Sequence, residues 1–340
     1  MDLAATPKVE LHRHLEGAIR LATIIELSRE AGLTLPADTP DELAPHALIT
    51  EPAADLEEAL QRFAIAQNAI HSYGAVRRIS REAVEDLAAE DVRLAELRFS
   101  PAFLCRPAGL DWDRALEAIR EGLGDAEAAG SPVTVGLIAI FSRDYGMASA
   151  ERTVEFALRH REDLIGFDIA GSEAGYPPSM YAEVIAPIRG SGLGLTAHYG
   201  ESGPPEYPRE AVEVLGTRRL GHGLSVARDA AVTALVAERG VALEMCPTSN
   251  WLTRGVPRVG DHPIRRLLHG GVSVTLNTDD PGLMGIDLVH EWRVARDEIG
   301  FTDEDFAAVT RNALEASFVA PEEKDRVRKE HFGWLDERRA

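Results

Sequence analysis

The chain has 340 residues, of which 45% are hydrophobic and 27% are charged, which is the composition of an ordinary globular protein. Its formal net charge of −20 argues against a surface that binds nucleic-acid phosphates, because such surfaces are rich in Lys and Arg. Its 2 cysteines are too few for a disulfide framework, and no apolar run approaches the ~20 residues of a membrane helix. We therefore expect a cytoplasmic protein whose partner is neither a nucleic acid nor a membrane.

The first predicted strand is short and carries two histidines at its end. Val9–His12 alternates weakly between apolar and polar residues and follows Pro7, which is typical of a strand that runs into a turn. The next helices are predicted at Ile19–Ala31, Asp55–Ile70 and Ala75–Glu90, with a Pro-rich loop at Leu33–Pro52. The apolar face of Asp55–Ile70 fits two interpretations, a stripe packed on the rest of the fold or a lid over a site.

From Val92 onward, predicted strands alternate with predicted helices. Together with Val9–His12 there are eight such strands, which predicts an α/β fold, a closed (β/α)8 barrel of the TIM type with additional helices after strand 1 and at the C-terminus. No linker, repeat or low-complexity tract is visible, so we expect a single domain over residues 1–340. The later strands are predicted at Val92–Phe99, Val133–Ile140, Ile165–Ile169, Leu193–His198, Arg219–His222, Val241–Met245 and Val272–Asp279. The later helices are predicted at Asp111–Ala129, Ala150–Arg161, Ser179–Ile188, Pro208–Leu215, Asp229–Arg239, His262–Leu268, Leu288–Glu298, Asp303–Ser317 and Glu322–Leu335.

Reactive side chains gather at the C-terminal ends of the predicted strands, where the active sites of such barrels lie. Residues two apart on a strand point to the same side, so His12 and His14 can both face one metal ion. Further candidates follow strands four, five, six and eight, at Asp168–Glu173, His198–Glu201, Gly221–Gly223 and Asn277–Pro281.

Each of these residues also has an ordinary structural interpretation, such as a hydrogen-bonded buried histidine or a capped turn. Their coincidence at one end of the barrel favours a site. Three imidazoles and one carboxylate suit Zn²⁺, with a position left for water. Glu201 lies three residues beyond His198, close enough to exchange protons with a substrate beside the metal. The remaining histidines are predicted on helices and loops away from these ends: His46, His71, His160, His262, His269, His290 and His331.

The motifs at the strand ends resemble those of the adenosine deaminase family of metal-dependent hydrolases, over nearly the whole chain. They are HRHLEG at His12–Gly17, RFSP at Arg98–Pro101, DIAGSE at Asp168–Glu173, HYGESG at His198–Gly203, GHG at Gly221–Gly223, CPTSN at Cys246–Asn250 and TLNTDDP at Thr275–Pro281. Their order and their strand positions together make the resemblance specific. It implies a zinc enzyme that hydrolyses the 6-amino group of a purine and releases ammonia.

The resemblance also implies a role for individual residues. Glu201 would donate a proton to N1 of the purine, which makes C6 electrophilic. His222 would orient the attacking hydroxide and help to take its proton, with assistance from Asp279. A protonated carboxyl group and a hydroxide are what aromatic deamination needs at neutral pH. The ligands of one Zn²⁺ per chain would be His12, His14, His198 and Asp279.

The substrate is a small-molecule purine by the same resemblance, held by His14, Glu16, Gly171 and Asp280. Asp280 would bind N7, and the Gly171 N–H would meet N3. Two departures leave the choice of purine open. Glu16 stands where nucleoside deaminases of the family typically carry Asp, and Tyr199 stands where a small residue is usual. The Tyr199 phenol can narrow the pocket, bind the substrate or pack behind it.

We favour adenosine and 2′-deoxyadenosine, with adenine or aminodeoxyfutalosine as alternatives that share the mechanism. The segment SEAGYPP at Ser172–Pro178 is similar to the corresponding segment of adenine-specific relatives in the family. Nucleoside 5′-monophosphates are less favoured, because no basic cluster stands near these strand ends. The oligomeric state stays open.

Other classes fit the sequence less well. Binuclear barrel hydrolases bridge their metals through a strand lysine, and Schiff-base aldolases also need one, whereas Lys8 is the only lysine before the C-terminal tail. The glycines at Gly190–Gly194 precede a strand, whereas a dinucleotide fingerprint follows one. The combined signature of other zinc deaminases, HxE followed by PCxxC, is absent because the sequence contains no PCxxC. A purine-binding barrel without catalysis would have gaps among the ligand and acid positions, and none is missing.

Overall fold

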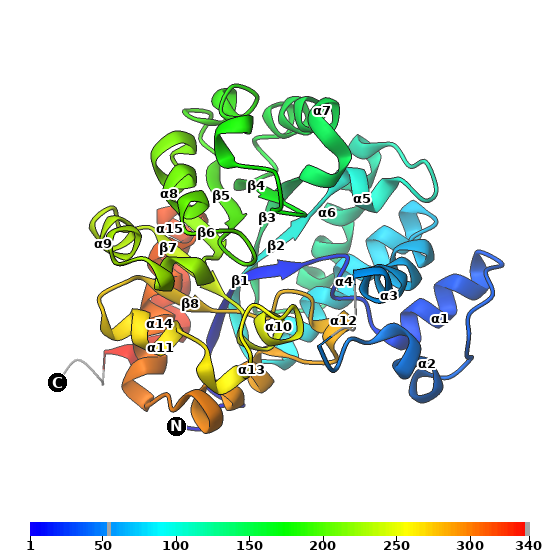
Figure 1. Ribbon diagram of the computed structural model, residues 1–340. Helices are drawn as coiled ribbons and strands as arrows, with labels where there is room; N and C mark the ends of the chain where they lie inside the picture. The colour runs from blue at the N-terminus through cyan, green and yellow to red at the C-terminus, as the bar shows by residue number, and fades with distance from the viewer. Residues whose placement is uncertain (53–55, 337–340) are drawn as a thin grey trace.

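The computed structural model describes residues 1–52 and 56–336, and within them the strands form one parallel sheet of eight in chain order (Figure 1). Each strand pairs with the next one along the chain, as crossover connections through outer helices require. The predicted TIM-type (β/α)8 barrel is therefore confirmed. The strands are β1 (Lys8–His14), β2 (Val92–Phe99), β3 (Thr134–Ser142), β4 (Gly166–Ala170), β5 (Gly194–Tyr199), β6 (Arg219–His222), β7 (Ala242–Met245) and β8 (Val274–Leu276).

Helices surround the sheet and bury its outer face (Figure 1). Outward strand residues such as Leu97 and Phe99 and inward helix residues such as Ile119 and Phe156 are almost fully buried in this core. A second cluster packs β1 and β2 residues against the C-terminal helices. The helices are α1 (Leu21–Glu30), α2 (Pro40–Ala47), α3 (Leu56–Ala69), α4 (Tyr73–Ala89), α5 (Pro101–Cys105), α6 (Trp112–Ala128), α7 (Gly146–Arg159), α8 (Glu206–Glu210), α9 (Ala230–Glu238), α10 (Pro247–Leu252), α11 (Ile264–His269), α12 (Pro281–Met284), α13 (Leu288–Val294), α14 (Asp303–Ala316) and α15 (Pro321–His331).

The barrel closes between β1 and β8 through a short seam. Backbone hydrogen bonds join Asp279 N to His12 O at 2.8 Å and His14 N to Asp279 O at 2.9 Å. Below them, side chains replace the ladder: Glu10 accepts from His12 N at 3.0 Å and from Thr278 N at 3.1 Å. Closing the barrel therefore brings Asp279 beside both histidines of β1.

Two predicted segments differ in kind from the structure, and the strand predicted at Val272–Asp279 is shorter, because β8 covers only Val274–Leu276. The segment Leu33–Pro52, expected as loop, contains α2, because Pro40 occupies the first turn and Thr39 caps it by accepting from Glu42 N. The helix expected at Ser179–Ile188 forms only two short 3₁₀ turns, at Pro178–Tyr181 and Ala186–Ile188, since Pro187 has no N–H for a continuous helix. The helix predicted at Asp55–Ile70 corresponds to α3, and its predicted first residue, Asp55, lies outside the described residues.

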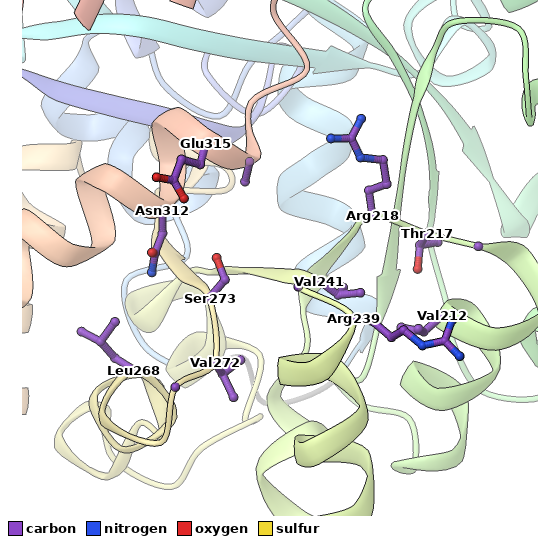
Figure 2. Close-up of a pocket in the computed structure, with 14 residues that line it drawn as sticks. Val212, Thr217, Arg218, Arg239, Val241, Leu268, Val272, Ser273, Asn312 and Glu315 are labelled. Atoms are coloured by element: carbon purple, nitrogen blue, oxygen red, sulfur yellow. The ribbon is translucent and has the colours of Figure 1, made fainter. Parts of the chain in front are cut away.

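A cavity of about 670 Å³ opens at the N-terminal ends of β6, β7 and β8 (Figure 2). Its lining includes Arg218, Arg239 and Glu315 at the surface and Ser273 before β8. This is the end of the barrel opposite to the histidines, so the cavity is not part of the candidate site. Among residues 1–52 and 56–336, no helix has the length and apolar character needed to cross a membrane.

Candidate metal centre and active site

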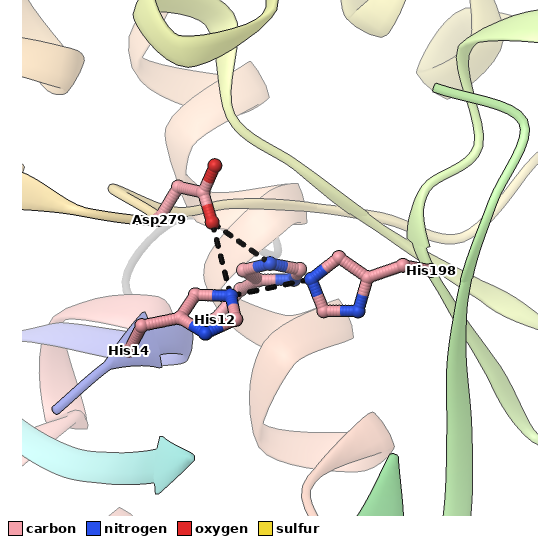
Figure 3. Close-up of side chains that lie close together, drawn as sticks. All are labelled: His12, His14, His198 and Asp279. Atoms are coloured by element: carbon pink, nitrogen blue, oxygen red, sulfur yellow. Dashed lines mark hydrogen bonds and ion pairs between the residues drawn. The ribbon is translucent and has the colours of Figure 1, made fainter. Parts of the chain in front are cut away.

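Three histidines and one aspartate converge at the C-terminal mouth of the barrel (Figure 3). His12 and His14 end β1, His198 lies on β5, and Asp279 follows β8. His14 Nε2 lies 3.2 Å from His198 Nε2 and 3.2 Å from Asp279 Oδ1. His12 Nε2 also lies 3.2 Å from Asp279 Oδ1, and one donor atom from each residue lies within 4.8 Å of the others.

This geometry fits a single metal ion. Two nitrogens bound to Zn²⁺ at about 2.0–2.1 Å in a tetrahedral arrangement lie about 3.3 Å apart, close to the spacing seen here. His12 Nε2 is buried and makes no hydrogen bond of good geometry within the described part of the chain, although Asp279 Oδ1 lies 3.2 Å away, so this nitrogen can serve as a ligand atom. Burial lowers the pKa of His198 to about 3, which keeps that ring neutral, the form that binds metals.

Buried charges behind the histidines fix the direction of their rings. His12 Nδ1 lies 2.7 Å from Glu244 Oε2 on β7, and His198 Nδ1 lies 3.1 Å from Asp168 Oδ1 on β4. Arg98 on β2 donates to both carboxylates at 2.7 Å. Although burial opposes the charge, Arg98 helps to hold the pKa of Glu244 well below its usual range. With the Nδ1 atoms engaged, both Nε2 atoms face the proposed metal.

Close approaches explain two motif glycines. A Cβ on Gly221 would lie 3.0 Å from both His12 Cε1 and His198 Cγ. A Cβ on Gly17 would lie 1.7 Å from Asp280 Oδ1. His222 and Asp279 themselves have positive φ angles, 61° and 70°. Such left-handed backbone is uncommon outside glycine and is typical of functional sites.

Glu201 and His222 face one another beside the cluster. His222 Nε2 lies 3.6 Å from Glu201 Oε2 and 4.0 Å from Asp279 Oδ2. The Thr253 hydroxyl donates to Glu201 Oε1 at 2.8 Å. The loop that carries Glu201 is held by Glu173, whose carboxylate accepts from the backbone N–H groups of 200, 201 and 203 at 2.7–3.1 Å. The predicted acid and the predicted orienting histidine therefore lie together.

The residues predicted on the substrate side border the same mouth. Burial raises the pKa of Glu16 to about 7, and its Oε1 accepts from Ser100 N at 2.7 Å. Burial and the neighbouring Asp279 raise the pKa of Asp280 well above its usual range, which favours a protonated carboxyl that can donate a hydrogen bond. A hydrogen bond from the Arg143 side chain to the Gly171 carbonyl, at 2.5 Å, fixes the position of Gly171.

Tyr199 packs behind the site. Its ring is fully buried, the Arg143 guanidinium lies 4.6 Å from the ring centroid, and its hydroxyl donates to Tyr176 O at 3.2 Å. Because His198 on the same strand faces the cluster, its neighbour Tyr199 points to the other side of the sheet. Of the three interpretations offered for Tyr199, packing behind the pocket is therefore the one that the structure supports.

The sequence interpretation missed the contribution of α10. Ser249 Oγ donates to Asp279 Oδ2 at 2.6 Å, and Asn250 Nδ2 lies 3.0 Å from His222 Nδ1. Asn250 Oδ1 in turn lies 3.0 Å from His262 Nε2, so the expectation that His262 lies away from the site is wrong. The physical reason for the difference is that the His262 side chain is buried, with only 4% of its surface exposed, and not on the outside of a surface helix as expected. The CPTSN motif was the available signal, but the pattern alone assigned no role within it.

The fold and the cluster together define a metal-dependent hydrolase built on a (β/α)8 barrel. A family model described as adenosine deaminase matches residues 7–332. The adenosine deaminase of Erwinia tasmaniensis is 37% identical over 322 residues, covering 95% of this chain and 97% of that protein. The adenosine deaminase of Shewanella loihica is 35% identical, covering 94% and 96%. The chain belongs to the adenosine deaminase family.

Solved structures agree with this assignment. Adenine deaminase from Arthrobacter aurescens superimposes with a TM-score of 0.89 at 27% identity, covering 98% of this chain and 100% of that chain. An amidohydrolase from Burkhoderia ambifaria with bound Zn has a TM-score of 0.88 at 27% identity, covering 98% and 92%. The ADAL–IMP complex has a TM-score of 0.86 at 27% identity, covering 98% of both chains. The chain is thus a zinc-dependent hydrolytic deaminase with a small-molecule purine ligand.

The carboxylate behind His198 predicts an effect on metal affinity. Asp168→Asn keeps the shape but removes the charge that orients the ring, so zinc affinity should fall about 10- to 100-fold in a chelator competition. Asp113→Asn is the matched control, because Asp113 also pairs with a histidine, His160 at 2.9 Å, on the protein surface. Equal zinc affinity in the two variants would contradict the orienting role.

Glu291 on α13 predicts a pH dependence of stability. Its carboxyl group is fully buried and accepts from Thr248 N at the start of α10, at 3.2 Å, and burial raises its pKa to about 8. Between about pH 4.5 and pH 8 the unfolded chain ionises this group while the folded chain does not, so the contribution of Glu291 to stability falls as pH rises.

Glu291→Gln mimics the protonated form and removes this dependence. In urea unfolding, the variant should gain stability relative to the wild type as pH increases through that window, and the difference should level off above it. A stability difference that does not change with pH would contradict the raised pKa.

Proposed function

We propose that the chain hydrolyses the 6-amino group of adenosine and 2′-deoxyadenosine to give inosine, 2′-deoxyinosine and ammonia. The observation that carries this proposal is the cluster of His12, His14, His198 and Asp279, with Glu201 and His222 facing one another beside it. Because these residues come from β1, β5, β6 and β8, the chain would act as a single domain over residues 1–340. Its relatives of 35–37% identity are adenosine deaminases, which supports the nucleoside as substrate.

The residues of the chain divide the work between proton transfer and binding. When bound, Zn²⁺ supplies hydroxide at neutral pH, because it lowers the pKa of a coordinated water towards ~7. Glu201, entering as the acid, gives its proton to N1 of the purine, which removes electron density from C6. Addition of hydroxide at C6 makes that carbon tetrahedral. The C6–N6 bond then breaks once the amino nitrogen has gained the proton of the added hydroxyl group, so that ammonia leaves and C6 becomes a carbonyl carbon.

Hydrogen bonds would fix the purine ring over the cluster. Asp280, kept protonated by burial, is suited to donate to N7, which carries only a lone pair. The N–H of Gly171 would meet N3, held in position by the bond from Arg143 to the Gly171 carbonyl. Glu16 would accept from a hydroxyl group of the sugar, and its second oxygen stays available because Ser100 engages only Oε1.

Adenine is the second candidate, and one feature of the site favours it. The space beside Glu16, lined by Phe63 of α3 and Leu283 of α12, measures about 10 Å³, room for about one water molecule. A sugar would require the α1–α3 side of the mouth to open, whereas a free base would not extend there. The structural similarity to an adenine deaminase points the same way.

A substrate comparison tests the proposal. Ammonia release by the zinc-loaded enzyme would be measured with adenosine, 2′-deoxyadenosine, adenine and aminodeoxyfutalosine. We expect kcat/KM to be highest for the first two, by at least tenfold. A preference for adenine or for the modified nucleoside would overturn the nucleoside assignment while keeping the chemistry. Activity with none of the four in a zinc-loaded protein would overturn both.

Replacing the acid tests the mechanism. Glu201→Gln keeps the size of the side chain but cannot deliver a proton to N1, so kcat should fall by about 10²- to 10⁴-fold while zinc stays bound. The control is Glu206→Gln, an exposed carboxylate five residues further along the chain. Turnover of the zinc-loaded Glu201→Gln enzyme at the rate of the control would show that another group is the acid.

A further inference from the structure

A buried amide holds the side of the His222 ring that faces away from the proposed substrate. Asn250 Nδ2 lies 3.0 Å from His222 Nδ1, and the two residues are 0% and 1% exposed. The other ring nitrogen, Nε2, points to Glu201 and Asp279. In a neutral imidazole one nitrogen donates and the other accepts. What Asn250 offers to Nδ1 therefore decides what Nε2 offers to the reacting groups.

The orientation of the Asn250 amide follows from a backbone donor. The backbone N–H of Ile264 donates to His262 Nδ1 at 3.3 Å. Because a backbone N–H can only donate a hydrogen bond, His262 Nδ1 must be the acceptor and carries no proton. Burial, with a smaller effect from His222, lowers the pKa of His262 to about 3, so this ring is neutral and its proton is on Nε2. His262 Nε2–H then donates to Asn250 Oδ1 at 3.0 Å.

The opposite orientation of the amide is ruled out by the same contacts. It would turn the Asn250 NH₂ group towards His262 Nε2, which would then have to accept, and the His262 proton would move to Nδ1. There it would meet the N–H of Ile264, donor against donor, in a buried site where an unsatisfied donor is costly. The hydrogen bonds therefore run in one direction, from Ile264 through His262 and Asn250 to His222 Nδ1.

We propose that Asn250 and His262 are positioning residues that hold His222 in the tautomer with its proton on Nε2. His222 then presents an N–H donor to the reacting groups in place of a lone pair. Under the deamination proposed above, on which this step rests, His222 orients the attacking oxygen by donating to it. It does not take the first proton from that oxygen, because Nε2 already carries one.

Nitrogen NMR reads the tautomer directly and needs no turnover. The zinc-loaded protein would be labelled with ¹⁵N-histidine and recorded at mildly alkaline pH, with the His222 signals identified by their loss in His222→Gln. We expect His222 Nδ1 to resonate as an unprotonated nitrogen and Nε2 as a protonated one. A protonated Nδ1 would overturn the proposal. This result is independent of the substrate, so a failure of the proposed function is distinguishable from a failure of the relay.

Two sets of variants test the relay. Asn250→Asp has the same shape but only acceptor oxygens, so it should move the His222 proton to Nδ1 and lower kcat with little change in KM or zinc content. A catalytic histidine in the wrong tautomer loses up to about 10⁴-fold in kcat, and we expect a loss of about 10²-fold or more. Asn312→Asp is the matched control, since the Asn312 amide is also a hydrogen-bond donor, but its acceptor is the backbone carbonyl of Val274, at 3.0 Å, at the far end of the barrel.

The second set acts one bond further away. His262→Leu should leave both His222 tautomers populated, whereas His262→Gln keeps a donor for Asn250 Oδ1 and should restore the wild-type spectrum and most of kcat. If Asn250→Asp does not fold, this pair and the wild-type spectrum decide the question. An unchanged His222 tautomer in both Asn250→Asp and His262→Leu would overturn the proposal.

Discussion

The site depends on a layer of ion pairs buried inside the barrel. Arg98 contacts Glu244 and Asp168, each at 2.7 Å, and Arg219 contacts Glu244 and Glu96, each at 2.6 Å. All five side chains are fully buried. Charges in such a place are costly to remove from water, and they persist only where partners surround them. Here each guanidinium lies between two carboxylates, which fixes the carboxylates that in turn orient His12 and His198.

The charges in this layer also explain why the mouth of the barrel suits a divalent cation. Arg98 and Arg219 supply two positive charges, against the carboxylates of Glu96, Glu244, Asp168 and, just above them, Asp279. Among these six groups the carboxylates outnumber the guanidinium groups by two, and this excess of negative charge favours a cation at the mouth. The ligands are therefore held in place before a metal arrives, and the metal balances a charge that the arginines leave uncompensated.

The positions of the ligands could be predicted from the sequence because parallel strands of a barrel end at one mouth. His12, His198 and Asp279 follow strand patterns, and the fold then brings them together. The layer beneath was not predicted, although Glu96, Arg98 and Glu244 interrupt otherwise apolar strands. A charged residue in a strand has the same pattern whether it faces solvent or a barrel interior, and only the closed barrel distinguishes the two. The relay through Asn250 and His262 depends on the packing of α10 and on the residues before α11, which no local pattern encodes.

The two departures from the family pattern have different physical consequences. Tyr199 lies on the outward side of β5, so it packs on Arg143 and does not line the pocket itself. Glu16 lies in the mouth, with one oxygen tied to Ser100 and a pKa of about 7 from burial. A carboxyl group that is half protonated near neutrality can accept or donate, so a sugar hydroxyl and a base edge are both acceptable partners. Under the proposed function, selectivity among purines would therefore rest on Glu16 and on the α1–α3 wall beside it, while the metal cluster, Glu201 and His222 would carry out the same reaction on any 6-aminopurine that this wall admits.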